Sequence, residues 1–232
     1  MKLEMHTDWN EVQTGLDNHG FARLPTVLSK KECEEIVGLY DQPHRFRSTI
    51  NMQRYRFGLG EYKYFCYPLP PLIQELRETF YQSLVSIANN WMQHLGLDIR
   101  YPQNLEAFLA ACHSGNQQRP TPLVLRYEAQ GYNTLHQDIY GEVFFPFQVV
   151  FMLSDPGKDF EGGELVFVEQ LPRAQSRAEV VMPRQGDAVI FTTNFRPVKG
   201  ARGYYRAKMK HGVSPVKKGI RYTAGLIFHD AS

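Results

Sequence analysis

Two residues with side chains that can bind a metal ion, His136 and Asp138, stand two positions apart within the stretch TLHQDIY, Thr134–Tyr140. The stretch resembles an extended strand, in which residues two apart point to the same face. An imidazole and a carboxylate side by side on a strand would supply two of the three ligands of a 2-His-1-carboxylate metal site. Because a His-x-Asp pair is common by chance, this interpretation requires a second histidine from elsewhere in the chain.

His211 is the best candidate for the third ligand because of the sequence that follows it. The segment HGVSPVKKGIRYT begins at His211 and reaches Arg221, which shares a strand face with Thr223 if the segment is extended. A keto acid bound to such a metal would need a partner for its far carboxylate, and a guanidinium offers two charge-assisted hydrogen bonds. The alternative for Arg221 taken alone is a solvated arginine on an edge strand. When Arg221 is considered together with His136 and Asp138, a role in binding the carboxylate of a keto acid is favoured.

The composition is that of an ordinary globular protein, with 43% hydrophobic and 22% charged residues in a chain of 232. Its three cysteines, Cys33, Cys66 and Cys112, are odd in number and lack a Cys-x-x-Cys spacing, which argues against a disulfide framework or a zinc-thiolate site. The first residues contain no apolar signal segment, and the apolar run Phe144–Leu153 is too short to cross a bilayer. We therefore expect a cytoplasmic protein without a membrane partner.

The first half of the chain is predicted to be mainly helical. A short helix is expected over residues 7–17, and a Ser29-x-x-Glu32 capping box opens another that ends near Tyr40. An apolar residue recurs every three or four positions from Leu72 to Leu95, which predicts a long helix packed on a sheet. Other expected elements are a brief strand over 20–25, a helix over 105–112 and a polar loop from residue 113.

From residue 123 onward, eight short β-rich runs alternate with turns, which is typical of a sandwich or barrel. The predicted fold class is therefore α+β, an eight-stranded jelly roll with the N-terminal helices packed on one face. We expect one domain over residues 1–232. Residues 1–120 would form the mostly helical support, and residues 121–232 the jelly-roll core.

The combined motif, His-x-Asp followed by H-x-V-x-x-V-x-x-G-x-R-x-T, resembles the 2-oxoglutarate- and Fe(II)-dependent dioxygenase superfamily, in particular its prolyl-hydroxylase-like members. The segments GGEL at 162–165 and GDAVIF at 186–191 are similar to turn-and-strand segments of that superfamily. The resemblance covers about residues 20–229 and implies a double-stranded β-helix, which is a jelly roll. It also implies Fe(II) as the metal, with 2-oxoglutarate and O2 as co-substrates.

By this resemblance, the iron ligands are His136, Asp138 and His211. The distal carboxylate of 2-oxoglutarate would bind to Arg221 and Thr223. Tyr127 matches a tyrosine that lies near the co-substrate in prolyl-hydroxylase-like members, although it could equally be a core aromatic residue. The resemblance implies no catalytic acid or base beyond the metal ligands. One departure is a basic insert between residues 191 and 211, which is longer than in the prolyl hydroxylases and puts a shared substrate in doubt.

Positive charge is concentrated in two segments that also contain aromatic residues, Arg196–Lys210 and Arg45–Lys63. The wider range 173–221 has 12 Lys and Arg against Glu179 and Asp187, a local charge of +10 in a chain whose net charge is +2. Basic groups interleaved with aromatic rings can follow phosphates and stack on unpaired bases. The alternative is solvated strand faces, on which lysine and arginine are normal.

Three functions are consistent with the sequence. The first is an oxygenase that hydroxylates or demethylates single-stranded or damaged nucleic acid, since the chain also looks like a bacterial branch of the superfamily proposed to act on alkylated DNA. The second is a hydroxylase of a protein side chain or small molecule. The third is an inactive jelly roll that binds a partner, and the intact set of His136, Asp138, His211 and Arg221 argues against it.

Overall fold

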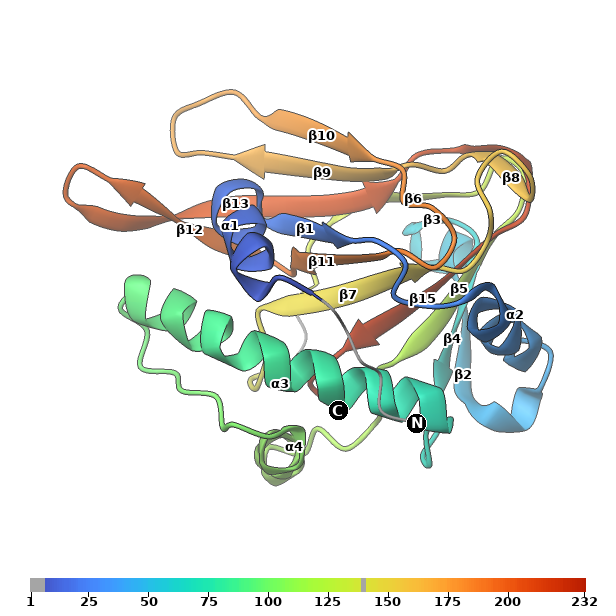
Figure 1. Ribbon diagram of the computed structural model, residues 1–232, viewed down its shortest axis with the longest axis horizontal. Coiled ribbons are helices and arrows are strands. Elements are labelled where there is room, and N and C mark those ends of the chain that lie inside the picture. Colours follow the sequence, from blue (N-terminus) through green and yellow to red (C-terminus); the bar gives the residue numbers. More distant parts are fainter. Residues whose placement is uncertain (1–6, 139–140) are drawn as a thin grey trace.

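Two antiparallel sheets face one another in the computed structural model, which describes residues 7–138 and 141–232 (Figure 1). Within these residues the larger sheet has seven strands in the order β1-β11-β7-β15-β5-β4-β2. Their bounds are Phe21–Leu24 (β1), Phe46–Asn51 (β2), Glu61–Phe65 (β4), Leu123–Tyr127 (β5), Phe147–Met152 (β7), Ala188–Thr192 (β11) and Arg221–Ile227 (β15). The central strands β7 and β11 consist of buried residues throughout, because this sheet is covered on both faces.

The smaller sheet follows the order β10-β9-β13-β6-β3, and β12 pairs with β13 beside this path. Its strands are Gly58–Leu59 (β3), Tyr132–His136 (β6), Leu165–Gln170 (β9), Arg177–Val181 (β10), Phe195–Gly200 (β12) and Gly203–Val213 (β13). A separate pair is formed by Phe160–Gly162 (β8) and Val216–Gly219 (β14). The predicted jelly roll in an α+β fold is confirmed, and each of the eight predicted β-rich runs overlaps a strand.

The helices follow the sequence signals closely. They are Trp9–His19 (α1), Lys30–Leu39 (α2), Pro71–His94 (α3) and Leu105–Ser114 (α4), with 3-10 turns at Pro43–Arg45 (η1) and Met52–Tyr55 (η2). Asp8 caps α1 by accepting from two backbone N–H groups, and the capping box of Ser29 and Glu32 opens α2 as predicted. His113 lies in the last turn of α4 and not in the polar loop that the sequence suggested.

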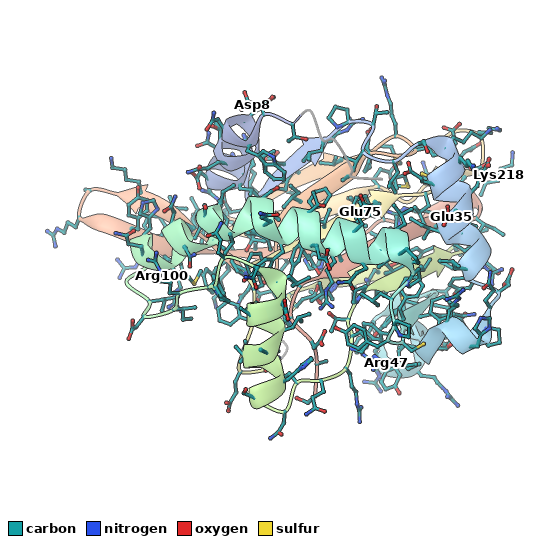
Figure 2. All side chains as sticks on the ribbon, turned by 60° about the horizontal axis from the view of Figure 1, so that its bottom comes forward. Asp8, Glu35, Arg47, Glu75, Arg100 and Lys218 are labelled. Carbon is teal, nitrogen blue, oxygen red and sulfur yellow. The ribbon has the colours of Figure 1, made fainter. Side chains whose placement is uncertain are left out.

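The long helix α3 lies across the outer face of the larger sheet, and α4 runs across the direction of α3 (Figures 1 and 2). Its predicted apolar stripe is the packed face, with Phe80 against Phe151 and Trp91 against Phe147 at ring-centroid distances of 5.5 and 4.6 Å. The first 120 residues also supply β1, β2 and β4 to the larger sheet. The division into helical support and jelly-roll core at residue 120 stays a prediction.

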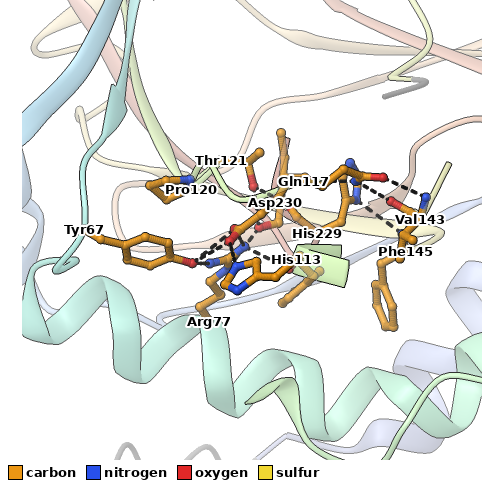
Figure 3. A network of polar contacts seen from close by, with 12 residues as sticks. Tyr67, Arg77, His113, Gln117, Pro120, Thr121, Val143, Phe145, His229 and Asp230 are labelled. Atoms are coloured by element: carbon orange, nitrogen blue, oxygen red, sulfur yellow. Dashed lines mark hydrogen bonds and ion pairs between the residues drawn. The ribbon is translucent and has the colours of Figure 1, made fainter. Parts of the chain in front are cut away.

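A buried ion pair joins α3 to the segment after β15 (Figure 3). Arg77 and Asp230 are both fully buried, and Arg77 Nη2 lies 2.8 Å from Asp230 Oδ1. The same guanidinium donates to the carbonyls of residues 227 and 228 and to the Tyr67 hydroxyl. Tyr67 donates in turn to Asp230, and His113 Nε2 lies 2.9 Å from the second carboxylate oxygen. Every nitrogen of Arg77 therefore has a partner, which is what a buried charge requires.

We predict that Asp230→Ala strongly destabilises the protein, because it leaves the Arg77 guanidinium buried without its carboxylate. Breaking a buried pair from one side costs about 3–5 kcal/mol. The free energy of unfolding in denaturant measures this loss. The matched control is Glu161→Ala, which breaks the exposed Lys218–Glu161 pair and should change stability by about 1 kcal/mol or less. Equal effects of the two substitutions would contradict the structural role of the Arg77–Asp230 pair.

Candidate metal centre and co-substrate pocket

A cavity of about 340 Å³ lies between the two sheets. The smaller sheet lines it with residues of β6 and β13, and the larger sheet with residues of β4, β5, β7 and β15. All six residues named from the sequence as site residues line this one cavity: Tyr127, His136, Asp138, His211, Arg221 and Thr223. The structure therefore brings together every residue that the sequence motif singled out.

The two histidines meet because β6 and β13 pair with His136 directly opposite His211. Their ring centroids are 4.3 Å apart. Asp138 Oδ1 lies 3.5 Å from His136 Nε2, and Asp138 Oδ2 lies 3.2 Å from His211 Nε2. One ligand atom from each of the three residues can be chosen so that all lie within 4.8 Å of one another. This donor set, two imidazoles and one carboxylate, is that of a facial triad.

The expectation that His136 and Asp138 share one strand is wrong. Strand β6 ends at His136, and Asp138 lies in the segment that follows it. The backbone N–H of Asp138 donates to the carbonyl of Thr193 at 3.0 Å, and the Gln137 side chain donates to Asn194. These contacts with the turn after β11 hold Asp138 beside the histidines without a strand. The last two residues of the TLHQDIY stretch, Ile139 and Tyr140, lie outside the described residues.

The surroundings of the three side chains favour metal binding. His136 Nδ1 lies 2.7 Å from the Thr134 carbonyl, so this nitrogen carries the proton and leaves Nε2 with a free lone pair. Burial is the main cause that lowers the pKa of His136, and the neighbouring His211 is the second. Both keep the His136 ring neutral. Burial alone would raise the pKa of Asp138, but His211, followed by His136 and a hydrogen bond from Gln148, outweighs it and holds that pKa well below its usual range. A carboxylate and a neutral imidazole are the forms that bind metals.

Arg221 is completely buried, and none of its guanidinium nitrogens has a hydrogen-bond partner among the described residues. It stands directly opposite Tyr127 in the pairing of β15 with β5, and its guanidinium carbon lies 5.5 Å from the Tyr127 ring centroid. Burial lowers the pKa of Arg221 to about 10, so the group stays charged at neutral pH. An unpaired buried charge is so unfavourable that the arrangement calls for an anionic ligand.

Thr223 and Tyr127 complete the surroundings of this charge. Thr223 is 2% exposed and lines the cavity from the same strand as Arg221, two residues further on. Tyr127 is fully buried, and burial raises the pKa of its hydroxyl to about 12. Gly163, from the GGEL segment, has φ +66°, and a Cβ atom there would lie 2.8 Å from Arg221 Cδ. That glycine therefore leaves the room that the Arg221 side chain occupies.

Gln148 belongs to this site although the sequence interpretation passed over it. Its side-chain nitrogen donates to Asp138 Oδ2 at 2.6 Å and lies 3.2 Å from His211 Nε2. It is only 6% exposed and is the single polar residue of β7, FQVVFM. That isolated glutamine inside an apolar run was the signal that could have found it, because a buried amide requires partners.

Comparisons with known proteins agree with this geometry. Residues 60–231 match the profile of a family described as "Oxygenase, catalysing oxidative methylation of damaged DNA". The chain belongs to this oxygenase family. Two uncharacterised proteins from two strains of Mycobacterium tuberculosis are each 47% identical to it over 165 residues, which is 71% of this chain and 71% of theirs.

Three solved structures share the fold at low sequence identity. A prolyl-4-hydroxylase of Pseudomonas putida superposes with a TM-score of 0.60 and 14% identity, over 97% of this chain and 100% of its own. An oxidoreductase of the 2OG-Fe(II) oxygenase family from Burkholderia pseudomallei gives 0.53 and 14%, over 98% and 94%. The viral collagen prolyl hydroxylase of Paramecium Bursaria Chlorella virus-1, in complex with 2-oxoglutarate, gives 0.53 and 15%, over 91% and 96%.

The family match confirms that the chain is an oxygenase, and the described residues bring the predicted ligands His136, Asp138 and His211 close enough to hold one metal ion. The dependence on Fe(II), 2-oxoglutarate and O2 is part of the proposed function. Within the described ranges, no helix is long and apolar enough to cross a membrane. The cytoplasmic location stays a prediction.

We predict that Gln148→Leu weakens Fe(II) binding about 10- to 100-fold, as is usual when a hydrogen bond to a metal ligand is lost. Without the amide donor, the Asp138 carboxylate loses the contact that orients it. Anaerobic titration calorimetry with Fe(II) measures the affinity. The control is Gln185→Leu, which removes a glutamine that donates to the Leu153 carbonyl away from the cavity. An unchanged Fe(II) affinity in Gln148→Leu would show that the amide only fills space.

Proposed function

We propose that this chain is a 2-oxoglutarate- and Fe(II)-dependent dioxygenase that oxidises alkyl groups on damaged, single-stranded nucleic acid. In this proposal His136, Asp138 and His211 bind the iron. Arg221 binds the distal carboxylate of 2-oxoglutarate. The observation that carries the proposal is the fully buried guanidinium of Arg221, which lies in the same cavity as the His/Asp/His set and has no hydrogen-bond partner among the residues that the structure describes.

The residues fit the co-substrate that this assignment requires. A dicarboxylic keto acid has a metal-chelating end and a free carboxylate, and the cavity has a metal-binding set and a free cation. Arg221 would bind that carboxylate through bidentate, charge-assisted hydrogen bonds, and the Thr223 hydroxyl would add another. In this proposal Tyr127, which stands directly opposite Arg221, contacts the same carboxylate through its ring or hydroxyl. The apolar lining, which includes Val150, Leu165 and Phe191, keeps water away from these contacts.

When bound, iron supplies the oxidising chemistry that couples decarboxylation of 2-oxoglutarate to attack on a substrate C–H bond. In the overall reaction, O2 gives one oxygen atom to succinate and the other to the alkyl carbon, and CO2 is released. A hydroxymethyl group formed on a base nitrogen then leaves as formaldehyde, and the nitrogen regains its proton. The contribution of the protein is to orient the co-substrate and to hold the alkyl group near the metal. No side chain needs to act as an acid or base.

The nucleic-acid part of the proposal is supported by the family description, which refers to damaged DNA, and by the basic segments of the chain. The likeness to prolyl hydroxylases supports the fold, and it gives no preference for a protein substrate. A hydroxylase of a protein side chain or small molecule is the alternative outcome of the substrate experiment described next.

We expect Fe(II)-loaded protein to decarboxylate 2-oxoglutarate faster in the presence of a methylated single-stranded oligonucleotide than with the unmethylated strand. Succinate and formaldehyde should form in equal amounts, and His136→Ala should abolish both because it removes an iron ligand. The anaerobic complex with Fe(II) and 2-oxoglutarate should also show a weak visible charge-transfer band. Absence of this band in the native protein would refute the assignment of Fe(II) and 2-oxoglutarate to this site. A normal band with stimulation only by peptides or small molecules would refute the nucleic-acid substrate alone.

Arg221→Met should separate function from stability. We predict that it weakens 2-oxoglutarate binding by about 30-fold or more, because the co-substrate carboxylate would be buried without a partner. The same substitution should raise the melting temperature of the protein free of 2-oxoglutarate, since it removes an unpaired buried charge. The control is Arg23→Met, which takes a partner away from the buried carboxylate of Asp187 and should lower the melting temperature. A lower melting temperature for Arg221→Met would contradict this role.

A further inference from the structure

A pair of exposed aromatic rings stands at the rim of the cavity, in the turn formed by η2 and β3. Tyr55 is 56% exposed and Phe57 45% exposed. Their rings are stacked, with centroids 5.5 Å apart and an interplanar angle of 18°. Phe57 also lines the cavity that contains the candidate metal centre. The pair therefore presents a flat aromatic surface to solvent beside the entrance of the site.

The position of this pair is fixed relative to the metal centre. The backbone N–H and the hydroxyl of Thr134 both donate to the Phe57 carbonyl at 2.8 Å. Thr134 lies on β6, two residues before His136. On the other side of the turn, Met52 is fully buried and accepts from the Phe57 N–H at 3.0 Å. The turn is thus attached to the strand that ends at the first candidate iron ligand.

Along the sequence, the charge next to the pair has one sign. Residues 42–60 contain four arginines and neither aspartate nor glutamate. Arg54 and Arg56 flank Tyr55 in sequence, and both are exposed. Within the described residues, neither forms an ion pair. Exposed rings between unpaired arginines are the elements with which proteins bind single-stranded nucleic acid, through base stacking and phosphate contacts.

We propose that Tyr55 and Phe57 form a stacking platform for the base next to the one that enters the cavity, and that Arg54 and Arg56 contact the flanking phosphates. This proposal rests on the proposed function and adds the surface that selects the substrate. An enzyme that acts on a base has to take it out of its stack, and a ring at the rim replaces the stacking that the neighbouring base loses. A peptide substrate would bind less well here as an added strand, because β3 is only two residues long and offers few backbone groups for pairing.

The other basic segment, the β12–β13 hairpin, is less suited to this role. Arg196 is buried and bound to Glu169, and Tyr204 is already stacked on His94 at a centroid distance of 4.1 Å. The hairpin projects from the body on the side away from β3 (Figure 1). Its charges lie at a distance from the rim and would add a general attraction for polyanions.

The test compares two exposed tyrosines by the binding of a fluorescently labelled, methylated single-stranded oligonucleotide to the full chain with Fe(II) and 2-oxoglutarate under anaerobic conditions. Tyr55→Leu keeps an apolar side chain but removes the ring, and it should weaken binding by about 5-fold or more, the effect expected for one base–aromatic stack. The matched variant Tyr204→Leu should weaken binding less than 2-fold. Each variant must first give the visible band of the iron and 2-oxoglutarate complex.

A second comparison tests the arginines. The double variant Arg54→Gln/Arg56→Gln should reduce the slope of log affinity against log salt by about 1.4, the value for two phosphate contacts to a single strand. The double variant Arg202→Gln/Lys208→Gln, on the hairpin, should leave the slope closer to that of the native protein. Unchanged binding in Tyr55→Leu, or a larger loss from the hairpin variants, would overturn the platform proposal. The proposed function fails separately, if the native protein shows no charge-transfer band or no turnover stimulated by the methylated strand.

Discussion

The antiparallel pairing of β6 with β13 is the constraint on which the candidate site depends. It places His136 opposite His211, two residues that are far apart in sequence, so that both imidazoles enter one cavity. The register shifts immediately after His211, where Gly212 allows the strands to approach: a Cβ atom there would lie 2.8 Å from the Asn133 carbonyl. A slip of one residue would turn either histidine to the opposite face of the sheet. The metal centre therefore forms only when β6 and β13 pair in this register.

Two buried arginines show how a structural charge differs from a functional one. Arg77 and Arg221 are both fully buried. Every side-chain nitrogen of Arg77 has a hydrogen-bond partner, whereas those of Arg221 have none in the described part of the chain. The first arginine ties a helix to the end of the jelly roll and offers nothing to a ligand. Arg221 is held by its strand as a buried charge without a partner, which is unfavourable. We therefore expect an anionic ligand to bind it and offset this cost. Burial alone would not have separated these two roles, whereas the inventory of hydrogen bonds does.

The sequence allowed the fold class to be predicted, because strand periodicity is a local property. The grouping of the six site residues came mainly from the resemblance to the dioxygenase superfamily, and Tyr127 was equally consistent with a core aromatic residue. The sequence interpretation misplaced Asp138, which lies beside the histidines through contacts with residues 193 and 194 and not through β6. Such a contact joins segments that are distant in the sequence, and no local pattern records it. Gln148 was passed over for a related reason: its importance comes from a hydrogen bond to Asp138, which lies on a different segment of the chain. The strands β8, β12 and β14 were also missed, since they are short or lie in a charged insert.

The two basic segments appeared equivalent in the sequence, and the fold distinguishes them. In the hairpin, the guanidinium of Arg196 neutralises Glu169 within the protein, so part of the local positive charge is used internally. At the rim, Arg54 and Arg56 have no such partner among the described residues, and Phe57, on which Tyr55 stacks, lines the cavity. Long-range attraction depends on total charge, but selection of a substrate depends on groups that reach the reacting atoms. The segment with fewer charges is consequently the better placed to select the substrate, because Thr134 attaches it to the strand that ends at the metal centre.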